Sequence, residues 1–162
     1  MTLQEIQNYL KEHCVLVFEY KSVYYSLQKK GCLFRPIYSL TDTDNPPQKR
    51  NSLEALFTQI CLHDGVYLRE IKNQIKVPNW NDPSWLSYEA IRHDVVVYNQ
   101  EIHFLYNEKY YWIAHSNNGI SHFSDAFGNT QEFNSPRDLF EHARIDNKSL
   151  KDIWSQVVVD AC

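Results

Sequence analysis

The sequence predicts a single α+β domain over residues 1–162, in which an antiparallel β-meander sheet is packed with several helices. Three observations lead to this fold class. The chain of 162 residues is 43 % apolar, which suits one compact core. Short β-branched and aromatic segments separated by short turns dominate residues 95–133. Segments with helix caps and helical apolar spacing precede and follow them, so strands and helices are expected in separate stretches.

The N-terminal segment predicts a helix followed by a strand. Thr2 and Glu5 form a capping box, and apolar residues follow it at helical spacing. Residues 14–20 (CVLVFEY) are rich in β-branched and aromatic side chains. This composition is typical of a strand.

Residues 21–40 fit two structures, and the sequence leaves both open. One is a pair of strands that turns at Lys30-Gly31. The other is a helix that ends at the same lysine and glycine, because the preceding apolar side chains also have helical spacing. Residues 41–50 predict a loop, because Pro46-Pro47 exclude regular structure.

A second helix is predicted to begin at Asn51 and Glu54 and to end before Gly65. Its expected buried face comprises Leu53, Leu56, Phe57, Ile60 and Cys61. Residues 66–75 then predict a strand, and residues 77–86 (VPNWNDPSWL) predict a second loop.

The following residues predict a meander of short antiparallel strands. The expected strands are 95–99, 102–106, 110–115, 120–125 and 130–133. The expected turns are Asn107-Glu108, Asn118-Gly119 and Gly128-Asn129. Because Asn-Gly favours a two-residue hairpin turn, His115 is predicted to face His122, and Trp112 to face Asp125.

Two capped helices are predicted after the meander. Ser135 caps the first, with Pro136 at its first helical position, and Asp146-Asn147 ends it. Ser149 caps the last helix. Its inward-facing side chains are expected to be Leu150, Ile153, Trp154 and Val157.

The predicted pairing of His115 with His122 suggests a metal-dependent or histidine-based enzyme as one alternative function. Opposed residues in an antiparallel sheet have Cβ atoms roughly 4.5–5.5 Å apart, a distance that suits two imidazole ligands. A metal site needs a third or fourth protein ligand, and Asp125 points to the opposite face from His122. We therefore assign no metal, cofactor or catalytic residue.

Composition and charge argue against several other classes. A net charge of −4 without a basic stripe lacks the electrostatic footprint of nucleic-acid binding. Glycine-rich phosphate-binding motifs are absent, and no run of apolar residues is long enough for a membrane span. The N-terminus has no signal-peptide core. The cysteines, Cys14, Cys32, Cys61 and Cys162, lack CxxC spacing, so we expect a cytoplasmic protein with reduced thiols.

Protein binding is the function that the surface features favour. Trp80 and Trp85 lie in a proline-rich loop together with Asp82, where such rings either are available to a partner or fold back over the core. Asp42 and Asp44 supply further acids in the preceding loop. These five residues form the predicted interface, in which complementary charge speeds encounter and the rings provide most of the affinity.

The C-terminal half resembles small bacterial proteins of the toxin-immunity type. The resemblance rests on the meander EIHFLYNEKYYWIAHSNNGISHFSDAFGNTQEF and the helical SPRDLFEHARIDNKSLKDIW, within residues 94–160. It implies a cytoplasmic, acidic, single-domain protein that binds and occludes a toxin domain without catalysis. It carries over no individual functional residue. A structural or regulatory subunit of a larger assembly is the remaining alternative.

Overall fold

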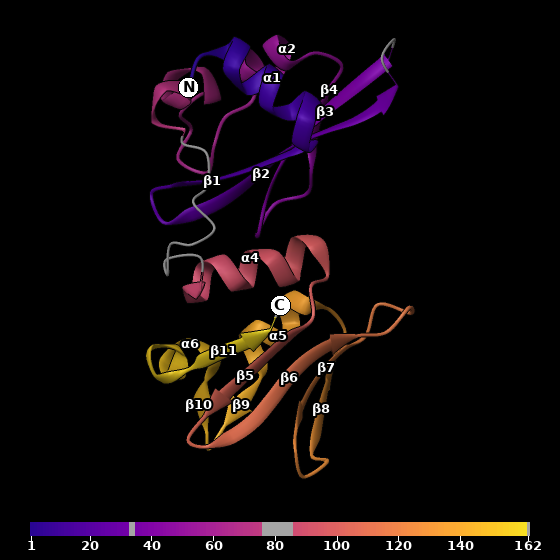
Figure 1. Cartoon of the computed structure of the whole chain (residues 1–162), viewed down its shortest axis with the longest axis vertical. Helices are drawn as coiled ribbons and strands as arrows, with labels where there is room; N and C mark the ends of the chain where they lie inside the picture. The colour runs from indigo at the N-terminus through magenta and orange to yellow at the C-terminus, as the bar shows by residue number, and fades with distance from the viewer. Residues whose placement is uncertain (33–34, 76–85, 162) are drawn as a thin grey trace. The chain divides into compact units, whose positions relative to one another are not determined.

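The computed structural model describes residues 1–32, 35–75 and 86–161 (Figure 1). In this part of the chain, helices and antiparallel sheets confirm the α+β class. The chain divides into two compact units, Met1–Asn81 and Asp82–Cys162. Each unit has its own cluster of buried apolar side chains. Folding of residues 1–162 as a single domain stays a prediction, which is tested below.

The N-terminal unit is a four-stranded antiparallel sheet with helices on one face. The strand order is β1-β2-β3-β4. Its elements are α1 (Leu3–His13), β1 (Val15–Tyr20), β2 (Val23–Cys32), β3 (Arg35–Asp42), β4 (Gln48–Arg50), α2 (Leu53–Gln59), α3 (Leu68–Ile71) and the 3-10 turn η1 (Lys72–Gln74). Its core combines α1 residues such as Ile6 and Leu10 with sheet residues such as Phe18 and Tyr25.

Local hydrogen bonds explain where the first helix begins. The Thr2 hydroxyl accepts a hydrogen bond from the Glu5 backbone N–H at 3.2 Å, and the Glu5 carboxylate accepts one from the Thr2 N–H at 2.6 Å. This reciprocal capping box is the predicted one. Cys14 ends the helix in a left-handed conformation, and β1 follows.

Residues 23–32 and 35–40 lie in strands, so the helical alternative for this region is wrong. A two-residue turn at Lys21-Ser22, with both φ angles positive, joins β1 to β2. Gly31 pairs with Pro36 in the β2–β3 ladder. The ladder therefore continues past Lys30-Gly31, and the predicted turn at these residues is also wrong.

Three predictions for the rest of this unit are wrong. Residues 41–50 contain the end of β3 and the short edge strand β4 as well as a loop. Residues 66–75 contain α3 and η1 in place of a strand, because the buried Leu68 and Ile71 have helical spacing. Cys61 lies beyond α2, in an isolated bridge with Tyr67, so it is not on the buried face of that helix.

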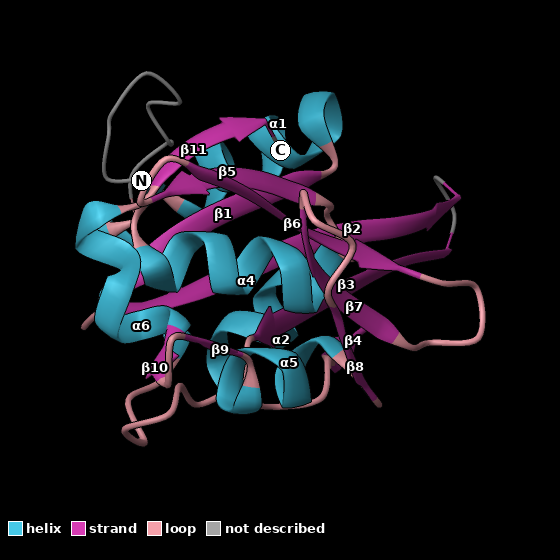
Figure 2. Cartoon of the chain, turned by 90° about the horizontal axis from the view of Figure 1, so that it is seen from below, coloured by secondary structure: helices cyan, strands magenta, loops and turns pink. Residues whose placement is uncertain are grey.

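The C-terminal unit is a five-stranded antiparallel sheet in the order β11-β5-β6-β7-β8, with helices and a small hairpin. In Figure 2, α5 and α6 lie beside the β9–β10 hairpin. Its elements are α4 (Tyr88–Tyr98), β5 (Ile102–Tyr106), β6 (Lys109–His115), β7 (Ser121–Asp125), β8 (Thr130–Phe133), α5 (Pro136–His142), β9 (Arg144–Ile145), β10 (Lys148–Ser149), α6 (Leu150–Ile153), the 3-10 turn η3 (Trp154–Gln156) and β11 (Val158–Ala161).

The capped helices of this unit are confirmed, but one predicted strand is wrong. Ser135 caps α5, and Ser149 caps α6. Residues 95–99 belong to the end of α4 and its C-cap, where the buried Ile91 and Val95 are four residues apart. The fifth strand of the sheet is β11, which the sequence analysis did not predict.

No helix in the described ranges is sufficiently long and apolar for a membrane crossing.

Candidate functional site

The β6–β7 hairpin turns at a different centre from the predicted one. The Gly119 N–H donates to the Ser116 carbonyl at 2.9 Å, and the Ser116 N–H donates to the Ile120 carbonyl at 2.9 Å. Gly119 has a φ of +87°. This is a three-residue loop with a left-handed glycine at its end, in contrast to the predicted two-residue Asn-Gly turn.

The shifted turn moves the two histidines to opposite faces of the sheet. His115 pairs with Ser121, and Ala114 pairs with His122, so the predicted His115–His122 pairing is wrong. Trp112 correspondingly pairs with Ser124 and does not face Asp125. Among the described residues, no group of three or more His, Cys, Asp and Glu side chains has the geometry to hold a metal ion.

His115 lies on the core side of the sheet. Its Nδ1 is 3.0 Å from the Ser121 hydroxyl, and its Nε2 is buried without a well-aligned hydrogen bond in the described structure. Burial lowers the pKa of His115, and the Gln100 backbone, which favours the charged ring, offsets only part of this effect. The ring is therefore neutral near pH 7.

His122 lies on the other face, in a Ser-His-acid line that resembles a catalytic triad. The Ser116 hydroxyl is 3.2 Å from Nε2, and Glu132 is 3.7 Å from Nδ1. The single hydroxyl proton of Ser116 has an acceptor 2.7 Å away, the Asn118 side-chain oxygen. The Ile120 carbonyl, 3.0 Å away, is a second acceptor for this proton, and both acceptors compete with His122 Nε2 for it. The geometry favours a turn cap.

The predicted interface residues are only partly described. Trp80, Asp82 and Trp85 lie outside the described residues. Asp42 is buried, and its carboxylate accepts hydrogen bonds from the backbone N–H groups of Asp44 and Asn45 at 2.8 and 2.7 Å. Asp42 therefore orders its own loop. Asp44 is exposed in the same loop.

The face of the five-stranded sheet opposite the helices, here called the outer face, carries two cross-strand rows. Val158, Leu105 and Tyr110 are paired across β11, β5 and β6. His103, Trp112 and Ser124 form the adjacent row across β5, β6 and β7. Val158 is 63 % exposed and Tyr110 is 45 % exposed, so the first row presents apolar surface to solvent.

The helices of the unit pack against the other face of this sheet. Side chains of α4, α5 and α6 join one buried cluster with Phe104, Tyr111, Ile113 and Phe123. No residue of the two outer rows belongs to that cluster. Within the described part of the unit, the consecutive rings Tyr110, Tyr111 and Trp112 therefore divide between a covered face and the outer face.

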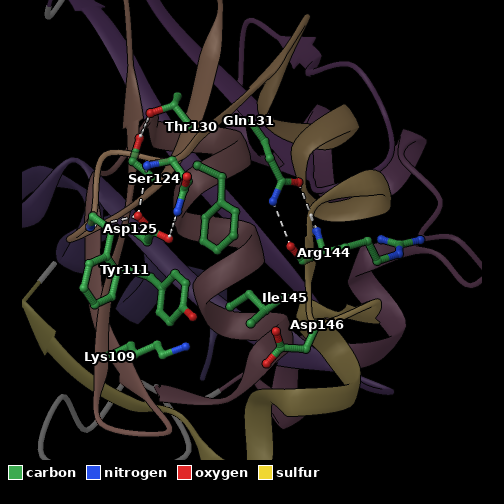
Figure 3. A pocket seen from close by; sticks show the side chains of 12 residues that line it. Lys109, Tyr111, Ser124, Asp125, Thr130, Gln131, Arg144, Ile145 and Asp146 are labelled. Carbon is green, nitrogen blue, oxygen red and sulfur yellow. Dashed lines mark hydrogen bonds between the residues drawn. The ribbon is translucent and has the colours of Figure 1, made fainter.

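A pocket of about 320 Å³ opens beside this sheet (Figure 3). It lies among the starts of β6 and β8, the β7–β8 turn and the β9–β10 hairpin. Its lining residues come from three separate segments of the chain, 109–111, 123–131 and 144–146, and no sequence motif joins them. Only the folded arrangement reveals this site.

Charge is divided unevenly between the two units. Residues 82–162 contain twelve Asp and Glu against six Lys and Arg, a formal charge of −6. Residues 1–81 contain eight against ten, a charge of +2, and the two values together give the −4 of the whole chain. The outer face and the pocket thus belong to the acidic unit.

Comparisons with protein-family models, with curated proteins and with solved structures find no match for this chain.

Proposed function

We propose that this chain is a non-catalytic protein-binding module, an immunity-type inhibitor that binds and occludes a toxin domain. The observation that carries the proposal is the outer face. Its exposed row of Val158, Leu105 and Tyr110 lies next to Trp112 on a sheet whose helices are packed on the other side. Tyrosine and tryptophan dominate the energetics of many protein interfaces, and exposed apolar patches mark interaction sites.

The acidity of the C-terminal unit supports a basic partner. A formal charge of −6 in residues 82–162 attracts a positively charged surface and accelerates encounter with it. Nucleases and other toxins that act on nucleic acids need such a surface for their substrate. An acidic protein that binds this surface blocks access to the substrate without any chemistry of its own.

The test is affinity capture with matched variants. The tagged protein is compared with Tyr110→Ser/Val158→Ser, which makes the outer face polar, and with Ile37→Ser/Tyr67→Ser, which changes exposed apolar residues of the N-terminal unit. We expect the native chain and the control to retain one near-stoichiometric basic toxin. The outer-face variant should lose it, and the purified toxin should be inhibited only by the two chains that bind it.

Two outcomes would contradict this proposal. Equal capture by the outer-face variant would exclude that face as the interface. A stable partner with no toxin activity would instead favour the structural or regulatory subunit. Circular dichroism of each variant provides the folding control, because a misfolded variant loses binding for a trivial reason.

A further inference from the structure

The pocket beside the sheet has an aromatic floor. Tyr111 and Phe123 stack with ring centroids 5.6 Å apart and planes at 11°, and Ile145 closes the floor. Phe127, which is 77 % exposed, stands at the rim on the β7–β8 turn. Phe127 thus offers flat ring surface to a ligand above an apolar floor.

Tyr111 places a hydroxyl group in this pocket. Its side chain is only 7 % exposed, and Figure 3 shows its hydroxyl directed into the cavity. No described residue forms a hydrogen bond with that hydroxyl. The hydroxyl oxygen is not among the buried polar atoms that lack a partner, so it opens into the pocket and is available to a polar group of a ligand.

Two carboxylates make the pocket negative. The Asp146 carboxylate is turned toward the cavity in Figure 3 and pairs with no described residue. Asp125 accepts hydrogen bonds from the backbone of Phe127 and Asn129 and from the Asn129 side chain, which keeps its pKa below the ordinary value. Burial, and then the charges of Asp146 and Asp125, raise the pKa of the Tyr111 hydroxyl.

The basic residues that line the pocket do not neutralise its negative charge. The Arg144 guanidinium donates to the carbonyls of Glu141 and Ala143 and runs away from the cavity in Figure 3. Of the two basic lining residues that the structure describes, only Lys109 is directed toward the cavity. Two carboxylates line the same cavity, those of Asp125 and Asp146. An anionic ligand would therefore meet more like charge than opposite charge.

We infer that this pocket binds the guanidinium group of an arginine side chain presented by a protein partner. A guanidinium is flat enough to stack on the exposed ring of Phe127, and its fork of N–H donors suits a carboxylate. One edge would donate to Asp146 and another N–H to the Tyr111 hydroxyl. The source of the arginine rests on the proposed function, in which the partner is a basic protein.

The probe for this inference is N-acetyl-arginine amide, titrated into the ¹⁵N-labelled full chain by NMR. We expect saturable shifts at the amides of Tyr111, Phe127 and Asp146 at millimolar concentration. N-acetyl-citrulline amide, which has the same shape without the charge, should bind several-fold more weakly. Asp146→Asn should weaken arginine binding about fivefold, since it removes a charged acceptor.

Two further variants separate the pocket from general electrostatics. Asp160→Asn changes the net charge equally but lies in β11, at the opposite edge of the sheet, so arginine affinity should be unchanged. Tyr111→Phe keeps the ring and removes the hydroxyl, and should weaken binding about threefold. Equal effects of Asp146→Asn and Asp160→Asn would overturn the assignment.

Other results would also overturn it. Equal affinity for arginine and citrulline would exclude a role for the charge, and tighter binding of acetate would identify an anion site at Lys109. Because the probe needs no macromolecule, its failure leaves the protein-binding function standing. If no toxin is captured, the measured preference of the pocket for arginine over citrulline still stands.

Discussion

The N-terminal and C-terminal units are built from the same kinds of element but present different surfaces. Each is an antiparallel sheet with helices packed on one face and a cluster of buried apolar residues. The N-terminal sheet follows chain order, whereas the C-terminal sheet takes its edge strand β11 from far along the sequence. Their formal charges are +2 and −6.

The cores of the two units also differ in their chemistry. The N-terminal core contains a polar link, in which the Tyr25 hydroxyl lies 2.6 Å from His63 Nδ1. The C-terminal core contains a stack of Phe104, Tyr111 and Phe123, and its polar contact is the hydrogen bond that the Trp154 indole N–H donates to the Leu86 carbonyl at 2.9 Å. A shared fold class therefore does not fix function: the outer face, the Tyr111 pocket and the negative charge all belong to the C-terminal unit.

The largest expected effect is loss of the aromatic core of the C-terminal unit. Phe104 is fully buried and contacts Tyr111, Phe123 and Trp154, so Phe104→Ala should cost about 3–5 kcal/mol of unfolding free energy. If the units fold separately, urea titration followed by NMR should show early loss of C-terminal signals alone.

The matched variant for this experiment is Leu27→Ala, which removes a fully buried side chain of the N-terminal unit. It should destabilise only the N-terminal signals, by about 2–5 kcal/mol. Simultaneous loss of both sets of signals in either variant would establish one cooperative domain over residues 1–162, as the sequence predicts.

The second effect concerns Trp80 and Trp85, which lie on either side of the boundary between the two units in the sequence. Trp80→Ala or Trp85→Ala is predicted to weaken partner binding by about 2 kcal/mol, roughly thirtyfold, if these rings are interface anchors. Calorimetric titration of the captured partner measures this change. An equal loss of thermal stability in the free protein would place the rings in the core instead.

A third effect is a pH response that belongs to the N-terminal unit. Burial raises the pKa of Tyr25 from 10.0 to about 12, so the unfolded chain loses this proton at lower pH than the folded one. Its contribution to stability is complete below pH 10 and declines as the pH rises toward 12. Denaturation of the N-terminal unit at several pH values measures the decline.

Tyr25→Phe is the control for that titration. The variant should be about 1–2 kcal/mol less stable at pH 7, because His63 loses its hydrogen-bond partner. Its stability should change less between pH 10 and pH 12 than that of the native chain. An identical decline in both proteins would assign the pH response to other tyrosines.

The smallest expected effect compares the two capping boxes, one in each unit. Thr2 caps α1 and Ser149 caps α6, each with a carboxylate that returns the hydrogen bond. Thr2→Ala and Ser149→Ala should each cost about 1 kcal/mol, confined to the unit that holds the cap. Hydrogen exchange at the first turn of each helix detects the loss, and transfer of the effect to the other unit would argue for tight coupling.

Local signals were sufficient to predict much of this fold. Thr2, Ser135 and Ser149 mark helix starts because a cap is a contact between near neighbours in sequence. The turn at Asn107-Glu108 was also predicted, and with it the pairing of His103 with Trp112. These features depend on only a few consecutive residues.

The errors arose where packing or distant pairing decides the structure. Residues 95–99 are β-branched, yet Val95 packs with Ile91 as part of a helix. The Asn118-Gly119 dipeptide fits two loop lengths, and the difference of one residue reverses the side of His115 or His122. Of the site, the sequence marks only the consecutive rings Tyr110, Tyr111 and Trp112, because the pocket is assembled from three distant segments.

The position of β11 has a consequence for synthesis of the chain. Val158 and Val159 pair with Leu105 and Phe104, so one edge of β5 stays open until more than fifty further residues have left the ribosome. During that interval the meander exposes an apolar strand edge, the kind of surface through which nascent chains associate. Protection of this strand edge by a chaperone, or by slow release of the chain, would then govern the yield of folded protein.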